Sequence, residues 1–126
     1  MEMGHGDEIV IADGNFPAAS HTVRLIRADG HGIPEMVSAL LQLFPLDQYV
    51  ERPVALMDRV PGDTIQTPIW QEYRRILDAG GYRDTTFEML DRFDFYDRAK
   101  NAYAVVATGE RAQYANILLK KGVIKK

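Results

Sequence analysis

The stretch that decides the fold is Glu8-Ile9-Val10-Ile11-Ala12, which is followed at once by Asp13-Gly14-Asn15. A short apolar run rich in β-branched side chains is typical of a strand that is buried on both faces of a sheet. The Asp-Gly-Asn cluster breaks strands, so we expect the strand to end there and to lead into a loop. Asp13 is therefore predicted to lie at the exit of a buried strand.

The rest of the chain alternates further strands with helices. Residues 34–44 carry apolar side chains at helical spacing, with Pro34 suited to the first turn and Pro45 to the stop. Alternation of this kind favours an α/β fold, here a single three-layer α/β/α domain over residues 1–126 with a mixed, largely parallel sheet. The predicted strands are 8–12, 21–27, 53–57, 87–90, 103–107 and 117–119, and the predicted helices are 34–44, 69–77 and 93–102.

The composition excludes several classes of function. A net charge of -3 gives no broad positive field, so we expect no nucleic-acid partner. The basic residues near the end, Lys120, Lys121, Lys125 and Lys126, are interpreted as a solvated tail. The start of the chain lacks the pattern of a signal peptide and no apolar run is long enough to span a membrane, so we expect no membrane association and a cytoplasmic location. With no cysteine, disulfides and thiolate chemistry are excluded.

Polar residues that follow the predicted strands are the first candidates for a site, because ligands of open α/β sheets collect at the carboxyl ends of strands. Asp13, Asp58, Arg92 and the stretch Thr108-Gly109-Glu110-Arg111 meet this condition. Each of them taken singly is more typical of a helix cap, a turn or a surface ion pair than of a site. Position in the sequence alone does not choose between these interpretations.

Two further features suggest chemistry on a small polar ligand. His5 lies between Gly4 and Gly6, and imidazole is the side chain best suited to proton transfer near neutral pH, although a solvated histidine is the plainer interpretation. Tyr114 and Asn116 would point to the same side if their segment is extended, and a phenol beside an amide suits a sugar. Core packing would explain Tyr114 equally well.

Motifs for metals and nucleotide cofactors are missing from the sequence. The three histidines show no compact metal-ligand spacing, and the chain has no glycine-rich phosphate loop or dinucleotide fingerprint. It also has no Gly-x-Ser-x-Gly elbow, which argues against a serine hydrolase. We therefore expect no metal and no cofactor.

Three long segments carry a resemblance to a known family. Together with the loop Asn15-Phe16-Pro17-Ala18, they resemble the fucose mutarotases, within a wider family that includes the ribose pyranases. The Asn15-Phe16-Pro17-Ala18 loop and the Arg92-Phe93 block with Phe95-Tyr96 favour the fucose branch. The three segments are Met3 to Asp13, Asp91-Arg92-Phe93-Asp94-Phe95-Tyr96-Asp97-Arg98-Ala99, and Thr108 to Val123, which contains Tyr114-Ala115-Asn116.

The sequence departs from the family pattern at its start. Members usually carry a helical segment before Gly-His-Gly-Asp, whereas only three residues precede Gly4 here. We expect this N-terminal helix to be missing, which affects helix packing and assembly but none of the matched polar residues. Gly14 also replaces an alanine that is common after the aspartate.

The resemblance implies a reaction and a set of residues. It makes His5 the acid/base residue, with Asp13, Arg92, Tyr114, Ala115 and Asn116 binding the sugar and Ala115 contributing through its backbone. The implied reaction is cofactor-free interconversion of the α and β anomers of a free monosaccharide, with L-fucose as substrate, by ring opening and closure. The family also implies self-association into a ring-like homo-oligomer, a decamer of stacked pentamers, with sites near the subunit boundaries.

Two alternatives stay open at this stage. One is a ribose pyranase, which would interconvert ring forms of ribose and differs in substrate rather than in class. The other is a non-catalytic sugar-binding accessory protein, which would need Asp13, Arg92 and Asn116 but no proton transfer by His5. Loss of anomer exchange with retention of sugar affinity in His5→Ala would separate the enzyme from the accessory protein.

Overall fold

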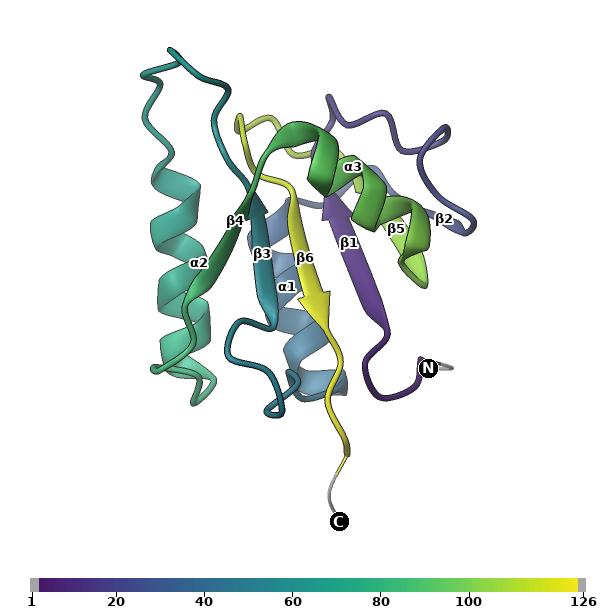
Figure 1. The fold of residues 1–126 in the computed structure, drawn as a ribbon, viewed down its shortest axis with the longest axis vertical. Coiled ribbons are helices and arrows are strands. Elements are labelled where there is room, and N and C mark those ends of the chain that lie inside the picture. Colours follow the sequence, from purple (N-terminus) through teal and green to yellow (C-terminus); the bar gives the residue numbers. More distant parts are fainter. Residues whose placement is uncertain (1–2, 125–126) are drawn as a thin grey trace.

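Within residues 3–124, which the computed structural model describes, the chain forms a six-stranded mixed sheet in the order β2-β5-β1-β6-β3-β4 (Figure 1). Strand β6 is antiparallel to both of its neighbours, and the other pairs are parallel. The prediction of a mixed, largely parallel sheet is confirmed. The strands are β1 (Glu8–Ala12), β2 (Leu25–Ala28), β3 (Val54–Met57), β4 (Phe87–Leu90), β5 (Ala104–Thr108) and β6 (Ile117–Lys120).

Strand β1 lies in the middle of the sheet, as its apolar run predicts. Val10 and Ile11 are fully buried, and β1 pairs with β5 on one side and β6 on the other. Alternate residues of β1 contribute to two separate cores, one on each face: Ile9 and Ile11 belong to the first, Val10 and Ala12 to the second. A sheet with a core on each face needs helices on both sides.

The helices supply those two layers. Helices α1 (Ile33–Leu43) and α2 (Pro68–Ala79) pack against each other, and buried residues of both belong to the first core. Helix α3 (Arg92–Asn101) covers the opposite face through Phe95 and Ala99 (Figure 1). The predicted three-layer α/β/α arrangement is confirmed.

The helix boundaries follow local signals, and one strand prediction was wrong in part. Helix α1 begins after Gly32, whose N–H donates to Glu35 at 2.6 Å, and it ends just before Pro45. The strand predicted over 21–27 begins only at Leu25, because the Thr22 hydroxyl bonds the backbone N–H and carbonyl of Arg24. Such local bonds compete with sheet pairing. The interpretation of the four lysines as a solvated tail was wrong for two of them, because Lys120 ends strand β6 and Lys121 is only 7% exposed. Lys125 and Lys126 lie outside the described residues.

Candidate functional site

The topology carries one loop across the carboxyl end of β1. Strands β5 and β6 flank β1, so the connection formed by residues 109–116 has to pass over the point where β1 ends. The Gly14 N–H donates to the Glu110 carbonyl at 2.9 Å, and the Thr108 hydroxyl donates to the Ala12 carbonyl at 2.8 Å. Asp13 is therefore enclosed by a segment that is distant in sequence: Asp13 and Asn116, which bond each other, are 103 residues apart.

Two residues of this connection hold its shape. Position 109 has no room for a side chain, because a Cβ on Gly109 would lie 2.2 Å from the carbonyl oxygen of Asp29. The Glu110 carboxylate accepts from the N–H of Ile33 at the start of α1 and from the N–H groups of Arg111 and Ala112. For Glu110, the plainer interpretation as a cap is the one that the structure supports.

Asp13 is the buried acid of this end of the sheet. Only 6% of its surface is exposed, its N–H donates to the Asn116 side-chain oxygen at 2.7 Å, and its carboxylate accepts from the Asn15 N–H at 3.0 Å. Burial raises the pKa of Asp13 above its ordinary value and outweighs the opposing backbone hydrogen bonds, including one from Ala115. The carboxyl group is thus held in place by several donors while its charge is disfavoured by lack of water.

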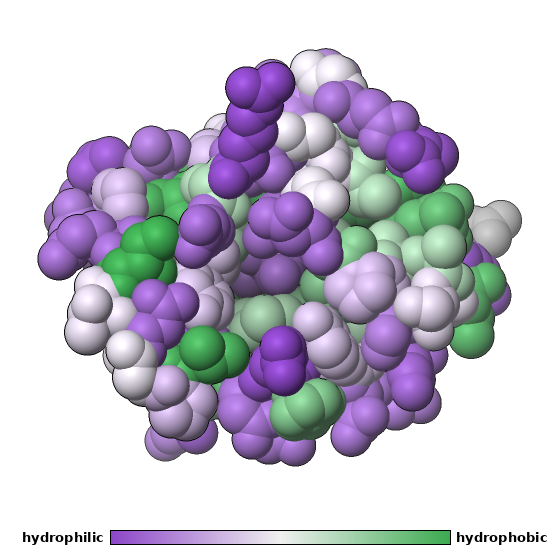
Figure 2. Space-filling model, turned by 90° about the horizontal axis from the view of Figure 1, so that it is seen from above, coloured by the Kyte–Doolittle hydropathy of each residue, from purple (hydrophilic) through white to green (hydrophobic). Residues whose placement is uncertain are grey.

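A pocket of about 190 Å³ opens beside Asp13. It combines a carboxylate, amides and a phenol with apolar and aromatic walls, the mixture that small polar ligands require. Figure 2 looks down on this end of the molecule and shows a hollow near its middle with hydrophilic residues inside. The pocket is lined by Asp13, Asn15, Phe16, Met57, Tyr96, Gln113, Tyr114 and Asn116.

Asn116 and Tyr96 have defined orientations in this pocket. Because the Asn116 oxygen accepts from Asp13, its amide nitrogen is the atom left to donate to a ligand. The Tyr96 ring packs against His21 with 4.8 Å between ring centroids and against Phe16 with 5.4 Å. These contacts hold an aromatic wall in place on the α3 side of the pocket.

The condition under which Tyr114 and Asn116 were expected to share a side, an extended segment, is not met at Tyr114, although both residues do line the pocket. Tyr114 has a φ of 56°, in the left-handed region that non-glycine residues seldom adopt. Its carbonyl accepts from the Trp70 indole N–H at 2.7 Å, and its hydroxyl donates to Asp63 at 2.6 Å. A strained backbone that is held by neighbours is a feature that clusters at binding sites.

Three other predicted residues lie outside the pocket lining. Ala115 is fully buried, and its backbone is engaged within the protein, by the Asp13 carboxylate through its N–H and by the Tyr73 hydroxyl at 2.6 Å through its carbonyl. Arg92 is exposed in the first turn of α3, with its guanidinium over the Phe93 ring. Asp58 is also exposed and accepts from the N–H of Arg59.

His5 lies at the opposite end of β1. It occupies a turn before the strand, its Nε2 donates to the Asp47 carboxylate at 3.2 Å, and its ring contacts Tyr49. Burial of Asp47 opposes its charge, but hydrogen bonds from Tyr49 and His5 prevail and hold its pKa below the ordinary value. An ionised Asp47 can only accept, so Nε2 is the donor in this bond, and Nδ1 is the ring nitrogen that Asp47 does not engage.

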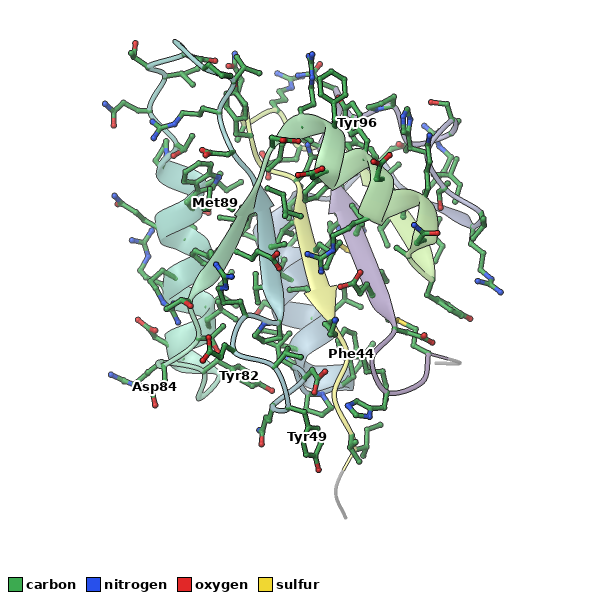
Figure 3. The ribbon with its side chains drawn as sticks, in the orientation of Figure 1. Phe44, Tyr49, Tyr82, Asp84, Met89 and Tyr96 are labelled. Atoms are coloured by element: carbon green, nitrogen blue, oxygen red, sulfur yellow. The ribbon has the colours of Figure 1, made fainter. Side chains whose placement is uncertain are left out.

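One chain does not bring His5 and the pocket together. The five residues of β1 span roughly 16 Å at about 3.3 Å per residue, which is more than one monosaccharide can bridge. Figure 3 shows the separation through two labelled side chains: Tyr49, beside His5, lies at the lower end of the sheet and Tyr96 at the upper end. A second hollow of about 300 Å³ lies at the His5 end, lined by Pro45, Leu46, Gln48, Tyr49, Val123 and Ile124.

Several residues of these two regions are not among the site residues predicted from the sequence. Met57 and Tyr96 line the pocket, Asp47 holds His5, and Asp63 bonds Tyr114. Tyr96 was inside a segment that carries the family resemblance, and Met57 ends a predicted strand, so both had a signal. Asp47 and Asp63 lie in loops, and only tertiary structure reveals their partners.

Residues 3–124 contain no group of three or more His, Cys, Asp or Glu side chains that could hold a metal ion. Across the same part of the chain, every helix is too short or too polar to cross a membrane. Together, the fold and pocket define a class: an α/β protein that binds a small polar ligand at the carboxyl end of its central strands.

Comparison with known proteins assigns the chain within that class. Residues 1–124 match the model of the RbsD / FucU transport protein family, and the chain belongs to this family. It is 54% identical to the human fucose mutarotase over 97% of this chain and 82% of the relative, and 49% identical to the L-fucose mutarotase of Actinobacillus pleuropneumoniae over 97% and 85%.

Solved structures agree with this assignment. The fucose mutarotase of Streptococcus pneumoniae in complex with L-fucose matches with a TM-score of 0.94 and 52% identity, covering 98% of this chain and 88% of that one. RbsD of Bacillus subtilis complexed with D-ribose matches with a TM-score of 0.72 and 26% identity, covering 98% and 88%. The chain is thus more similar to this fucose mutarotase than to this ribose-binding relative.

Proposed function

We propose that this protein is a cofactor-free isomerase that interconverts the α and β anomers of a free monosaccharide, with L-fucose as its substrate. The observation that carries the proposal is the polar pocket beside Asp13, in a chain 52% identical to a fucose mutarotase solved with L-fucose. The resemblance noted in the sequence and the comparisons with relatives agree on this activity. A ribose pyranase is the more distant alternative, with 26% identity to the D-ribose complex.

The reaction needs one group that removes a proton and one that supplies it. Ring opening removes the proton of the anomeric hydroxyl, breaks the bond between C1 and the ring oxygen, and protonates that oxygen. Rotation about the C1–C2 bond and the reverse proton transfers then close the ring on the other face of the aldehyde. Positioned acid/base groups of this kind are each typically worth roughly 10²–10⁴-fold in rate.

We assign these tasks to the residues as follows. His5 exchanges a proton with the sugar through Nδ1, because Nε2 is held by Asp47. Asp13 and the amide nitrogen of Asn116 bind sugar hydroxyls, and Tyr96 and Met57 form the apolar walls. Tyr114 binds the sugar through its hydroxyl. Ala115 contributes by fixing the Asp13 carboxylate through its N–H. Arg92, at the start of α3 and outside the pocket lining, is assigned a minor part in sugar binding.

We further propose that each active site is shared by two copies of the chain, in a ring-like homo-oligomer such as a decamer. The separation of His5 from the pocket along β1 supports this, since a single chain holds the two halves too far apart. Exposed apolar side chains lie near His5, namely Tyr49, Val123 and Ile124, and along the sheet edge formed by β2, namely Val23 and Ile26. Exposed apolar groups of this kind are typical of surfaces that a partner covers.

We retain the cytoplasm as the proposed location and a single domain as the proposed organisation.

The experiment that tests the function is anomeric exchange of L-fucose measured by NMR saturation transfer, with D-ribose in parallel. We expect faster exchange than in buffer for fucose, lost in His5→Ala and retained in His31→Ala. His31 is a matched control, since its side chain is exposed and pairs with the nearby Glu35. Fucose binding without any acceleration would instead identify a non-catalytic accessory protein, and acceleration only for ribose would identify a pyranase.

A further inference from the structure

Tyr114 is held at both ends by the segment that connects β3 to α2. This connection, residues 58–67, leaves β3 directly after Met57, which lines the pocket. Trp70, in the first turn of α2, donates its indole N–H to the Tyr114 carbonyl at 2.7 Å. Asp63, in the connection itself, accepts the Tyr114 hydroxyl hydrogen at 2.6 Å.

The second partner of the Tyr114 hydroxyl is also in this connection. The Val60 N–H donates to the Tyr114 oxygen at 3.3 Å. A phenol has one hydrogen and two acceptor positions. The Tyr114 hydrogen is donated to Asp63, and the Val60 N–H occupies one acceptor position of the oxygen. A single acceptor position therefore remains to face a ligand.

From this arrangement we infer that Asp63 is a positioning residue that makes Tyr114 a hydrogen-bond acceptor toward the sugar. The inference rests on the proposed function, because it concerns how the same pocket handles a sugar hydroxyl. The sugar would donate its hydroxyl hydrogen to the Tyr114 oxygen, which selects a substrate with a hydroxyl group at that point. Without Asp63, the Tyr114 hydrogen is free to rotate toward the ligand, and Tyr114 no longer acts only as an acceptor in the pocket.

The charges around the pair are consistent with this assignment. Hydrogen bonding to Tyr114 holds the pKa of Asp63 below its ordinary value, so the carboxylate is charged and can only accept. The same bond raises the pKa of Tyr114 and keeps the phenol protonated. Arg59 is the nearby cation that favours the charged form of Asp63, and its guanidinium is tied to the connection through the Ile65 carbonyl at 3.0 Å.

A simpler role for Asp63 is to shape the connection, and one substitution separates the two roles. The other Asp63 oxygen accepts from the Ile65 N–H at 3.0 Å and closes a local turn. Asp63→Asn preserves an acceptor for Ile65, but it places an N–H donor opposite the Tyr114 hydroxyl. A residue that only shapes the loop would tolerate this change, whereas a residue that sets the polarity of Tyr114 would not.

The test measures L-fucose exchange and fucose affinity in Asp63→Asn, Asp63→Ala, Tyr114→Phe and the double variant Asp63→Ala/Tyr114→Phe. We expect both Asp63 substitutions to lower exchange at limiting fucose by roughly tenfold or more, since positioned hydrogen bonds in such sites are worth that much. In the Tyr114→Phe background, Asp63→Ala should cause no further loss. Wild-type behaviour of Asp63→Asn, or an equal loss with and without the Tyr114 hydroxyl, would overturn the inference.

A measurement that does not depend on activity separates this inference from the proposed function. The phenol carbon of Tyr114, labelled with ¹³C, reports its ionisation by NMR. Replacing Asp63 by asparagine should lower the pKa of Tyr114, because the carboxylate that holds its hydrogen is gone. An unchanged Tyr114 titration would contradict the pairing even in a protein that turns over fucose. A lowered pKa in a protein that does not accelerate exchange would keep the pairing and reject the proposed function.

Discussion

The two ends of the central strand differ in how completely the chain builds them. At the carboxyl end, Asp13 is 6% exposed and is fixed by hydrogen bonds to Asn116 and Asn15. At the amino end, the His5 side chain is 46% exposed and is held by a hydrogen bond to Asp47. The proposed binding half is preorganised within a chain, while the proposed proton-transfer half projects from it.

This contrast gives the proposed assembly a chemical purpose. A sugar held at the carboxyl end of one chain needs an acid/base group from elsewhere, and an exposed histidine on a neighbouring copy supplies it. Oligomerisation would then complete the site rather than only stabilise the subunit.

Complementation between two inactive variants gives the largest effect. His5→Ala removes the proton-transfer half and Asn116→Ala removes part of the binding half, so each variant alone should lack catalysed fucose exchange. Mixed oligomers formed by co-expression should regain activity at those boundaries where an intact His5 faces an intact Asn116. Exchange is measured by NMR saturation transfer. A mixture as inactive as its components would place both halves of the site in one chain and remove the contrast.

The Asp47–His5 pair should give the next largest effect. Asp47→Asn keeps the shape of the side chain but removes the charge that holds the His5 ring. A charge-assisted hydrogen bond is worth about 1.5–3 kcal/mol, and this corresponds to roughly 10- to 100-fold in rate. We expect a fall of that size in the exchange rate at saturating fucose, with fucose affinity preserved. A loss of affinity in place of rate would move Asp47 from proton transfer to binding.

At the other end of the strand, Gly109→Ala tests how rigid the binding half is. The new Cβ would collide with the Asp29 carbonyl, so the backbone has to shift, and strain of this kind costs typically about 1–3 kcal/mol. The free energy of unfolding, measured by urea denaturation, should fall by that amount. Gly30→Ala is the matched control, because a Cβ there meets nothing within 4 Å. Equal stability of the two variants would show that the connection over β1 yields easily.

Much of the fold could be predicted because its signals are local. The apolar run of β1, the helical spacing of α1 and the proline stops fixed element types, and the strand end at Asp13 marked one side of the pocket. The left-handed backbone of Tyr114 could not be predicted, because it depends on Trp70 and on the connection that contains Asp63. The separation of His5 from Asp13 follows from strand β1, which runs between them and could be predicted from the sequence.

The burial of Asp13 predicts a pH dependence of stability. Its pKa is raised in the folded state above the ordinary value of 3.8, so folding favours the protonated form. This contribution is present at low pH and is lost as pH rises from the ordinary carboxyl range through the raised pKa. The stability of wild type should therefore fall relative to Asp13→Asn as pH rises toward neutral, as measured by urea denaturation. Asp84→Asn, at an exposed aspartate (Figure 3), should show no such trend.

Arg92→Ala should have the smallest effect and sharpens the boundary of the binding half. The side chain is exposed and lies over Phe93, and it is not part of the pocket lining. Exposed charged side chains contribute typically about 0–1 kcal/mol, so we expect fucose affinity, measured by calorimetry, to change by less than roughly fivefold. A much larger loss would mean that Arg92 turns inward when the sugar or a neighbouring copy is present. Sugar recognition would then extend beyond the preorganised pocket around Asp13. Part of it, like proton transfer, would depend on assembly or on the bound sugar.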